Sequence, residues 1–362
     1  MTIDSDVSNI RLRTKIVNDV TLRDNIDSMD DFLDVDYLYA STNTRCLERT
    51  LLNRAKFVRM SEAKNIPDAL KVLTESGWNE IRAETMAQVE EALAAERQQT
   101  ISNIYELSPD KNLVNVFMLK YDYHNIKTYF KGEGSINKDY ESLFIDAGMV
   151  PLRKMLTILR EKTYMFLSTA MRTAVIDAEE MLARTGDAQL MDILLDKACY
   201  QEMLFFAEET GIELLIGYVE MAIDTANLRA AVRMKKTGRN LEYMRQAYIQ
   251  GGNLNSASLV AEITPEYLES LFVGGPLAEA SQIAGAILRG NETMSKLDLA
   301  TDNALTKYVR DRGGYATFGP EVLIGYLTAR ETELTAIRVI IAGIAAGLPT
   351  ESITERLRDA YV

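Results

Sequence analysis

The chain has 362 residues, of which 47% are hydrophobic and 26% charged, so it can bury substantial cores and is long enough for two or three domains. Its formal net charge of −13 argues against a nucleic-acid partner and against wide contact with an anionic membrane surface, because both kinds of binding depend on Lys and Arg. One histidine and two widely spaced cysteines, Cys46 and Cys199, argue against a zinc site and suit a reducing compartment.

The start of the chain does not predict a signal peptide, because it carries Asp4 and Asp6 and lacks an apolar core region. The most notable apolar run, Val339–Leu348, is shorter than the roughly 20 residues that a bilayer span requires. We therefore expect a cytoplasmic protein that has no membrane span of its own.

The first third of the chain is predicted to be largely helical. Residues 1–36 are polar and acidic, and we treat them as an N-terminal extension outside the repeats described below. Apolar periodicity predicts one long helix over Tyr37–Met60. Pro67 begins a shorter helix that ends before Gly77, and Ile81–Leu107 is rich in strong helix formers.

The next helix, Ser108–Gly132, has the most complete set of helix signals. Ser108 is a favourable N-cap, Pro109 suits the first helical position, and Asp110 suits the positive end of the helix dipole. Its apolar stripe recurs at steps of three and four residues and consists of Val116, Leu119, Tyr123, Ile126 and Phe130. We therefore predict an amphipathic helix here.

Two later helices repeat this arrangement. After helices predicted over Pro151–Thr185 and Ala188–Glu209, Thr210 and Glu213 form a capping box that begins the second helix of this kind. Further predicted segments lie near Pro265, near Pro276 and over Thr293–Arg312; Gly319 and Pro320 then begin the third such helix, and Pro349 begins a terminal one. Since no segment shows the alternation of a strand, we predict an all-α fold.

Each of these three helices carries an acidic residue five positions before a basic one. The sets are Asp122-x-x-Asn125-Ile126-Lys127, Asp224-x-x-Asn227-Leu228-Arg229 and Glu333-x-x-Ala336-Ile337-Arg338. The residue at the Asn position follows the predicted cap by 17 in every copy (125 − 108, 227 − 210, 336 − 319). The copies lie 102 and 109 residues apart (227 − 125, 336 − 227), which is too long for a solenoid repeat of about 20–50 residues. We therefore predict three helical repeats, at 37–135, 136–240 and 241–362.

The acid and the base of one hexapeptide lie about 140° apart around the helix, so they cannot readily pair with each other. Each must reach a neighbouring helix, another repeat or another protein. A basic cluster at the end of the second helix either complements the helix dipole or docks a partner. The candidate packing or partner-contact residues are Asp122, Asn125, Lys127, Asp224, Asn227, Arg229, Arg233, Lys235, Lys236, Glu333 and Arg338, and Arg239 completes the basic cluster.

The sequence contains little that predicts catalysis. His124 is the only histidine, and the other two copies have Ala226 and Thr335 at its position, so we interpret it as a structural, hydrogen-bonded residue. Neither a Walker-type phosphate loop nor a G-x-G-x-x-G sequence after a strand is present. Nucleotide hydrolysis within this chain is therefore not supported by its sequence, and we predict no catalytic residues, cofactor or metal.

The run FMLKYDYHNIK over Phe117–Lys127 resembles the signature of the C-subunit family of V-type ATPases, whose member in eukaryotic V-ATPases is called the d subunit. The likeness covers the chain from about Tyr37 to the C-terminus. Ala336, where the repeat would prefer Asn, and the residues before Tyr37 depart from the pattern. The other matching stretches are Tyr39–Met60, Asp224–Arg229 and Tyr326–Arg338.

The resemblance implies a funnel of three similar helical domains around a pseudo-threefold axis. It also implies a central-stalk component that receives the rotating axle, made of the D and F subunits, and sits on the membrane rotor (proteolipid) ring. Such a component couples rotation to ATP-driven transport of H⁺ or Na⁺, or to ATP synthesis, without itself being catalytic. Two other functions stay open: an all-α adaptor with three repeats and no rotary partner, and an enzyme that uses carboxylates and His124.

Overall fold

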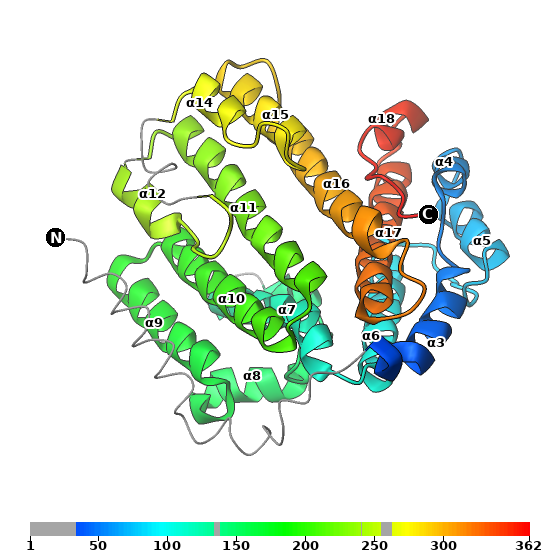
Figure 1. Ribbon diagram of the computed structural model, residues 1–362, viewed down its shortest axis with the longest axis horizontal. Helices are drawn as coiled ribbons and strands as arrows, with labels where there is room; N and C mark the ends of the chain where they lie inside the picture. Colours follow the sequence, from blue (N-terminus) through cyan, green and yellow to red (C-terminus); the bar gives the residue numbers. More distant parts are fainter. Residues whose placement is uncertain (1–33, 134–137, 240, 255–262) are drawn as a thin grey trace.

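The computed structural model describes residues 34–133, 138–239, 241–254 and 263–362, and within these ranges every regular element is a helix (Figure 1), which confirms the predicted all-α class. The N-terminal extension predicted over 1–36 lies almost wholly outside them. The elements are η1 (Asp34–Tyr37), α3 (Leu38–Glu48), α4 (Arg54–Ser61), α5 (Ile66–Glu75), α6 (Met86–Leu107), α7 (Lys111–Glu133), η2 (Lys138–Leu143), α8 (Leu152–Glu161), η3 (Tyr164–Phe166), α9 (Thr169–Thr185), α10 (Ala188–Thr210), α11 (Glu213–Lys236), α12 (Leu241–Ala247), α14 (Pro265–Ser270), α15 (Ala278–Leu288), α16 (Met294–Gly313), α17 (Pro320–Ala345) and α18 (Thr350–Thr354).

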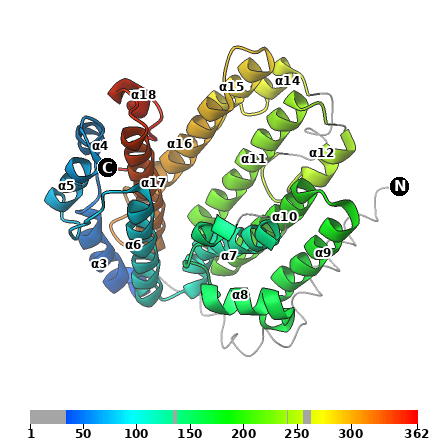
Figure 2. The same ribbon diagram turned by 180° about the vertical axis from the view of Figure 1, so that it is seen from behind.

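Three long helices bear the hexapeptides, and we call α7, α11 and α17 the motif helices. Each packs along a second long helix: α7 along α10, α11 along α16, and α17 along α6. Figures 1 and 2 show α16 between α11 and α17, with α7 and α10 on one side of the molecule and α6 on the other. The shorter helices surround these three pairs.

Two predicted long helices are broken in the structure. The helix predicted over Tyr37–Met60 is divided into α3 and α4, because the Asn53 side chain accepts a hydrogen bond from the Lys56 N–H and caps a new helix. The helix predicted over Pro151–Thr185 ends at Lys162, whose φ of 55° is left-handed, and α9 restarts after the N-cap Ser168.

The predicted caps of the first two motif helices were wrong. Ser108 is the C-cap of α6, and α7 begins only after Asp110, whose carboxylate accepts the N–H of Asn112. Thr210 is the last residue of α10, so it forms no capping box with Glu213; the N-cap of α11 is Ile212. Only the cap predicted at Gly319 is confirmed. The constant spacing of 17 therefore does not describe the actual helix starts.

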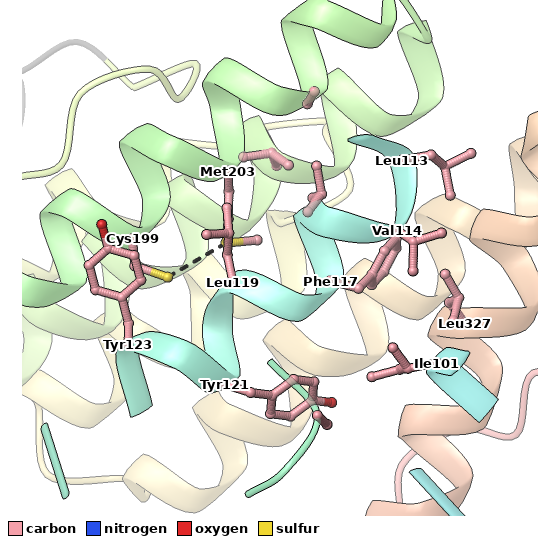
Figure 3. Close-up of a cluster of buried hydrophobic side chains, with 14 of the residues drawn as sticks. Ile101, Leu113, Val114, Phe117, Leu119, Tyr121, Tyr123, Cys199, Met203 and Leu327 are labelled. Atoms are coloured by element: carbon pink, nitrogen blue, oxygen red, sulfur yellow. Dashed lines mark hydrogen bonds between the residues drawn. The ribbon is translucent and has the colours of Figure 1, made fainter. Parts of the chain in front are cut away.

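Hydrophobic side chains form three clusters in the described residues. The first joins α7, α10 and the start of α11 to parts of α6 and α17 (Figure 3), and the third joins the rest of α11 to α12, α14, α15 and α16. The second unites two distant parts of the sequence, residues 52–93 and 334–357. In the second cluster, side chains from near both ends of the described chain share one core.

Candidate functional site: polar clamps on the motif helices

The first hexapeptide fastens a later segment of the chain to α7. Asp122 and Asn125 are fully buried. The Asp122 carboxylate accepts the backbone N–H groups of Met149 (2.8 Å) and Val150 (3.2 Å). The Asn125 side chain donates to the Ile145 carbonyl (2.8 Å) and accepts the Ile145 N–H (2.9 Å). We call such an acid, its amide neighbour and the segment they bind a polar clamp.

The second hexapeptide makes the same polar clamp on α11. Asp224 accepts the backbone N–H groups of Asn253 (3.0 Å) and Leu254 (3.0 Å). Asn227 donates to the Ile249 carbonyl (2.8 Å) and accepts the Ile249 N–H (2.9 Å). Both side chains are buried. Two regions with little sequence identity thus repeat one hydrogen-bond pattern.

Each clamped segment contains a glycine at the point of closest approach. A Cβ atom at Gly148 or at Gly252 would clash with the carboxylate that binds its own segment. The segments, 145–150 and 249–254, share the pattern Ile-x-x-Gly-x-[Val/Leu]. This shared pattern is the sequence signal that would have located the bound segments.

The third motif helix carries a reduced clamp. Glu333 of α17 is buried; it accepts the backbone N–H of Leu52 (2.6 Å) and also pairs with Arg330. Ala336 occupies the amide position, is buried, and can make no side-chain hydrogen bond. The third copy therefore keeps its acid and its bound backbone N–H but lacks the amide pair.

The basic residue of each hexapeptide reaches the second long helix of its own pair. None of the hydrogen bonds resolved in the described ranges links the acid and the base of one hexapeptide. The base–acid pairs are Lys127–Asp196 on α10 (2.6 Å), Arg229–Asp302 on α16 (2.6 Å) and Arg338–Glu90 on α6 (2.5 Å). Acid and base thus have separate tasks: the acid binds backbone, and the base ties two long helices together.

Burial changes the acidity of the clamp carboxylates. Desolvation raises the pKa of Asp122 to about 7, although the two backbone N–H groups that it accepts act in the opposite direction. Desolvation also raises the pKa of Asp224, against the hydrogen bonds from Leu254 and Asn253. The first clamp therefore titrates near neutral pH.

The basic cluster at the end of α11 does not act as one group. Arg229 faces α16, whereas Arg233, Lys235, Lys236 and Arg239 are exposed. Arg239 donates to the side chain of Gln189 (3.1 Å). For Arg233, Lys235 and Lys236 no partner is seen among the described residues. These three cations are available to another molecule.

A second group of charges, which sequence reasoning missed, joins three long helices. Glu331 of α17 pairs with Arg97 of α6 (3.1 Å), accepts the hydroxyl of Tyr121 on α7 (2.7 Å) and lies 4.0 Å from Lys120. Burial alone would raise the pKa of Glu331, but Lys120, Arg97 and Tyr121 outweigh it and hold that pKa at about 2. The contacts span more than 200 residues of sequence, so no local pattern predicts them.

His124 and Cys199, the residues considered as catalytic or metal-binding candidates, contact other parts of the fold. His124 Nε2 lies 2.9 Å from the Leu143 carbonyl oxygen. Cys199 is buried beside Met203, with 3.9 Å between the sulfur atoms (Figure 3), and burial raises the pKa of its thiol. Among the described residues, no three His, Cys, Asp or Glu side chains are placed to hold a metal, and no helix is both long and apolar enough to cross a bilayer.

An apolar groove of about 1090 Å³ runs between α9 and α10. Its apolar lining includes Met181, Leu190, Ile193, Leu194 and Phe205. Glu202 also lines the groove, and its carboxylate accepts the hydroxyls of Tyr123 (2.8 Å) and Ser168 (2.5 Å).

Known proteins and one protein family are similar to this chain over most of its length. The family model described as ATP synthase (C/AC39) subunit matches residues 40–356. The chain is similar to the C subunit of the A-type ATP synthase of Thermococcus kodakarensis, at 22% identity covering 88% of this chain and 89% of the relative. It is also similar to the C subunit of the V-type sodium ATPase of Enterococcus hirae (22%; 74% and 81%) and to the C subunit of the A-type ATP synthase of Haloferax volcanii (25%; 68% and 73%).

Proposed function

We propose a function from one premise: this chain belongs to the ATP synthase (C/AC39) subunit family. We propose that it is a non-catalytic central-stalk component of a rotary V-type ATPase. In this role it couples the rotating axle, made of the D and F subunits, to the membrane rotor ring, and it is bound to the cytoplasmic face of the membrane through that ring. The machine transports H⁺ or Na⁺ with ATP, or makes ATP.

One observation carries this proposal beyond family membership. Each motif helix is tied to its second long helix by a base–acid pair, and each hexapeptide acid binds the backbone of its own clamped segment. A part that transmits torque must not deform, and the hydrogen bonds of the three buried acids, combined with close packing of the long helices, resist deformation. Rigidity of this kind suits a coupling part.

We also propose that the chain forms three similar helical units arranged in a funnel. The three motif helices, their second long helices and their base–acid pairs repeat, which supports three similar units arranged in a funnel. The exposed cations at the end of α11 and the groove between α9 and α10 are surfaces that such a hub could offer to an axle or a ring. An obligate contact of this kind would bury about 2,000 Å² or more in total.

The competing function is an all-α adaptor outside any rotary machine. Affinity purification of the full chain from its own cells, followed by identification of the bound proteins, separates the two. The coupling role predicts stalk and ring proteins in stoichiometric amounts. Recovery of unrelated proteins only, with no part of an ATPase present, would support the adaptor instead.

A further inference from the structure

The groove between α9 and α10 presents apolar side chains that the described part of the chain covers only partly (Figure 1). Its volume of about 1090 Å³ exceeds the roughly 300–1,000 Å³ that is usual for small-molecule pockets. The half-buried apolar residues that line it include Met181, Leu190, Ile193, Leu194 and Phe205. A surface of this size and character indicates a peptide segment as its occupant.

The chain itself contains a segment with the pattern that such a groove binds. Residues 1–33 lie outside the described ranges and before the match to the family model, which begins at residue 40. On a helix, five apolar side chains between residues 10 and 20 would share an arc of about 160°. They are Ile10, Leu12, Ile16, Val17 and Val20. The pattern predicts an amphipathic helix, the kind of element that lays its apolar face into a hydrophobic groove.

The lengths of this predicted helix and of the groove agree. The lining residues extend along α9 from Ser168 to Met181, which corresponds to about 20 Å of helix. A helix over residues 10–20 is about 17 Å long. Residues 21–33, which we call the connector, then join it to Asp34 and can span roughly 40 Å when extended.

The described chain begins at the end of the molecule that the connector has to reach. Asp34 lies beside Gly319, at the start of α17. The starts of α17 and α11 are in contact, since Glu321 and Leu214 both lie against Gly313. Because α11 follows α10 after two residues, Asp34 and the end of α10 share one end of the molecule. The groove extends into the last turn of α10, so the connector has a short distance to cover.

The charges of the predicted helix and of the groove are complementary. Residues 10–20 carry three basic residues and one acid, a net charge of +2 (3 − 1). Asp177 of α9 and Glu208 of α10 are exposed on the two walls of the groove. Of the cations in the lining, Lys197 donates to a backbone carbonyl of α12 (3.0 Å), and Arg172 suits the connector, which has four Asp residues and one Arg.

We infer that residues 10–20 of this chain occupy the groove between α9 and α10 of the same molecule as a helix. The apolar side of that helix packs on the groove, and its basic residues face the acids on the walls. Another protein then reaches the groove only by displacing this segment. The inference does not depend on the coupling role proposed above.

Hydrogen–deuterium exchange of the full chain, measured by mass spectrometry without any partner, tests the inference. Ile16→Asp places a charge on the apolar side of the predicted helix, and the matched control Leu22→Asp places one outside that side. Peptides covering 10–20 and 168–181 should exchange at least about tenfold faster in Ile16→Asp than in the wild type. Leu22→Asp should match the wild type.

The reciprocal variants change the groove. Phe205→Ser removes an aromatic side chain from its lining and should also speed exchange over residues 10–20. Its control is Ile176→Ser, on an exposed residue of α9 that does not line the groove, and it should leave that exchange unchanged. Should Phe205→Ser fail to fold, Ile16→Asp decides alone, because it alters no residue of the described core.

Three results would overturn the inference. The first is exchange over residues 10–20 in the wild type as fast as in Ile16→Asp. The second is a loss of protection in Ile16→Asp that leaves residues 168–181 unchanged. The third comes from carbodiimide coupling of Lys15 to the carboxylates around it, mapped by mass spectrometry. A link from Lys15 to an acid of α9 or α10 within the monomer supports the inference, whereas such a link in dimers only makes the groove an interface between two copies.

Discussion

The carboxylate of Glu333 accepts the backbone N–H of Leu52 at 2.6 Å, across 281 residues of sequence. This bond lies where the chain passes from α3 to α4, and it coincides with the break in a helix that the sequence predicts to be continuous. It also fixes the turn between α3 and α4 on α17, the last long helix. The stability of the fold and its dependence on pH should both depend on such buried acids.

Glu333→Ala should lower the free energy of unfolding by about 2 kcal/mol, because it leaves the Leu52 N–H without its acceptor and takes from the buried Arg330 one of its two acidic partners, Glu96 being the other. Urea denaturation of the purified chain measures this. Arg338→Ala is the matched control, since it breaks a largely exposed pair and should cost less than about 1 kcal/mol. Equal losses in the two variants would contradict the structural role of Glu333.

The two clamp glycines should be intolerant of a side chain. Gly148→Ala and Gly252→Ala would each force a methyl group against the bound carboxylate and should destabilise the fold by about 1–3 kcal/mol. Gly275→Ala is the control, because its nearest neighbour would lie at ordinary contact distance, 3.6 Å. Thermal unfolding followed by circular dichroism compares them, and an unchanged melting temperature in both clamp variants would count against the clamp geometry.

Asp122 should make stability depend on pH in an unusual direction. Its pKa of about 7 in the folded protein is above the value of about 3.9 for an unfolded chain, so the folded state holds the proton more tightly. The stability contributed by this group is complete below about pH 4 and is lost as pH rises to about 7. Unfolding of the wild type and of Asp122→Asn, measured from pH 4 to 8, should show the wild type losing stability relative to the variant. A constant difference across that range would refute this.

The exposed end of α11 should matter for assembly and not for folding. Replacing Arg233, Lys235 and Lys236 together by Gln should change the free energy of unfolding by about 1 kcal/mol or less, because all three side chains are exposed and only their interaction with the helix dipole is lost. If these cations dock a partner, the triple variant should recover fewer partner proteins in affinity purification. Full recovery would assign them to the helix dipole alone.

The helical class and most of the helices could be predicted from sequence because periodicity is a local property. The apolar stripe predicted on α7 covers only part of its buried surface, since Tyr121, Asp122 and Asn125 outside that stripe are buried as well. The starts of α7 and α11 could not be predicted, since Ser108 and Thr210 are good caps that each complete the preceding helix instead. When two adjacent helices compete for one capping residue, tertiary packing decides the outcome, and the capping preference of Ser or Thr does not.

The bound segments and the charged contacts of Glu331 also lay beyond local reasoning. A buried acid in a hexapeptide indicates that some backbone or cation must satisfy it, but not which one. Comparison of 145–150 with 249–254 would have supplied the answer for two copies, because the shared Ile and Gly are visible in the sequence. For the third copy the partner lies at the other end of the chain, where no repeat pattern indicates it.

As proposed, this chain couples rotation to transport without catalysing hydrolysis. The most direct test of that role is ATP-driven ion uptake into inverted membrane vesicles, measured beside ATP hydrolysis by the detached soluble head, with this chain deleted and then restored. We predict that deletion abolishes uptake, that head hydrolysis persists, and that restoring the chain returns uptake. Uptake that continues without the chain, or hydrolysis by the head that requires it, would contradict the coupling role.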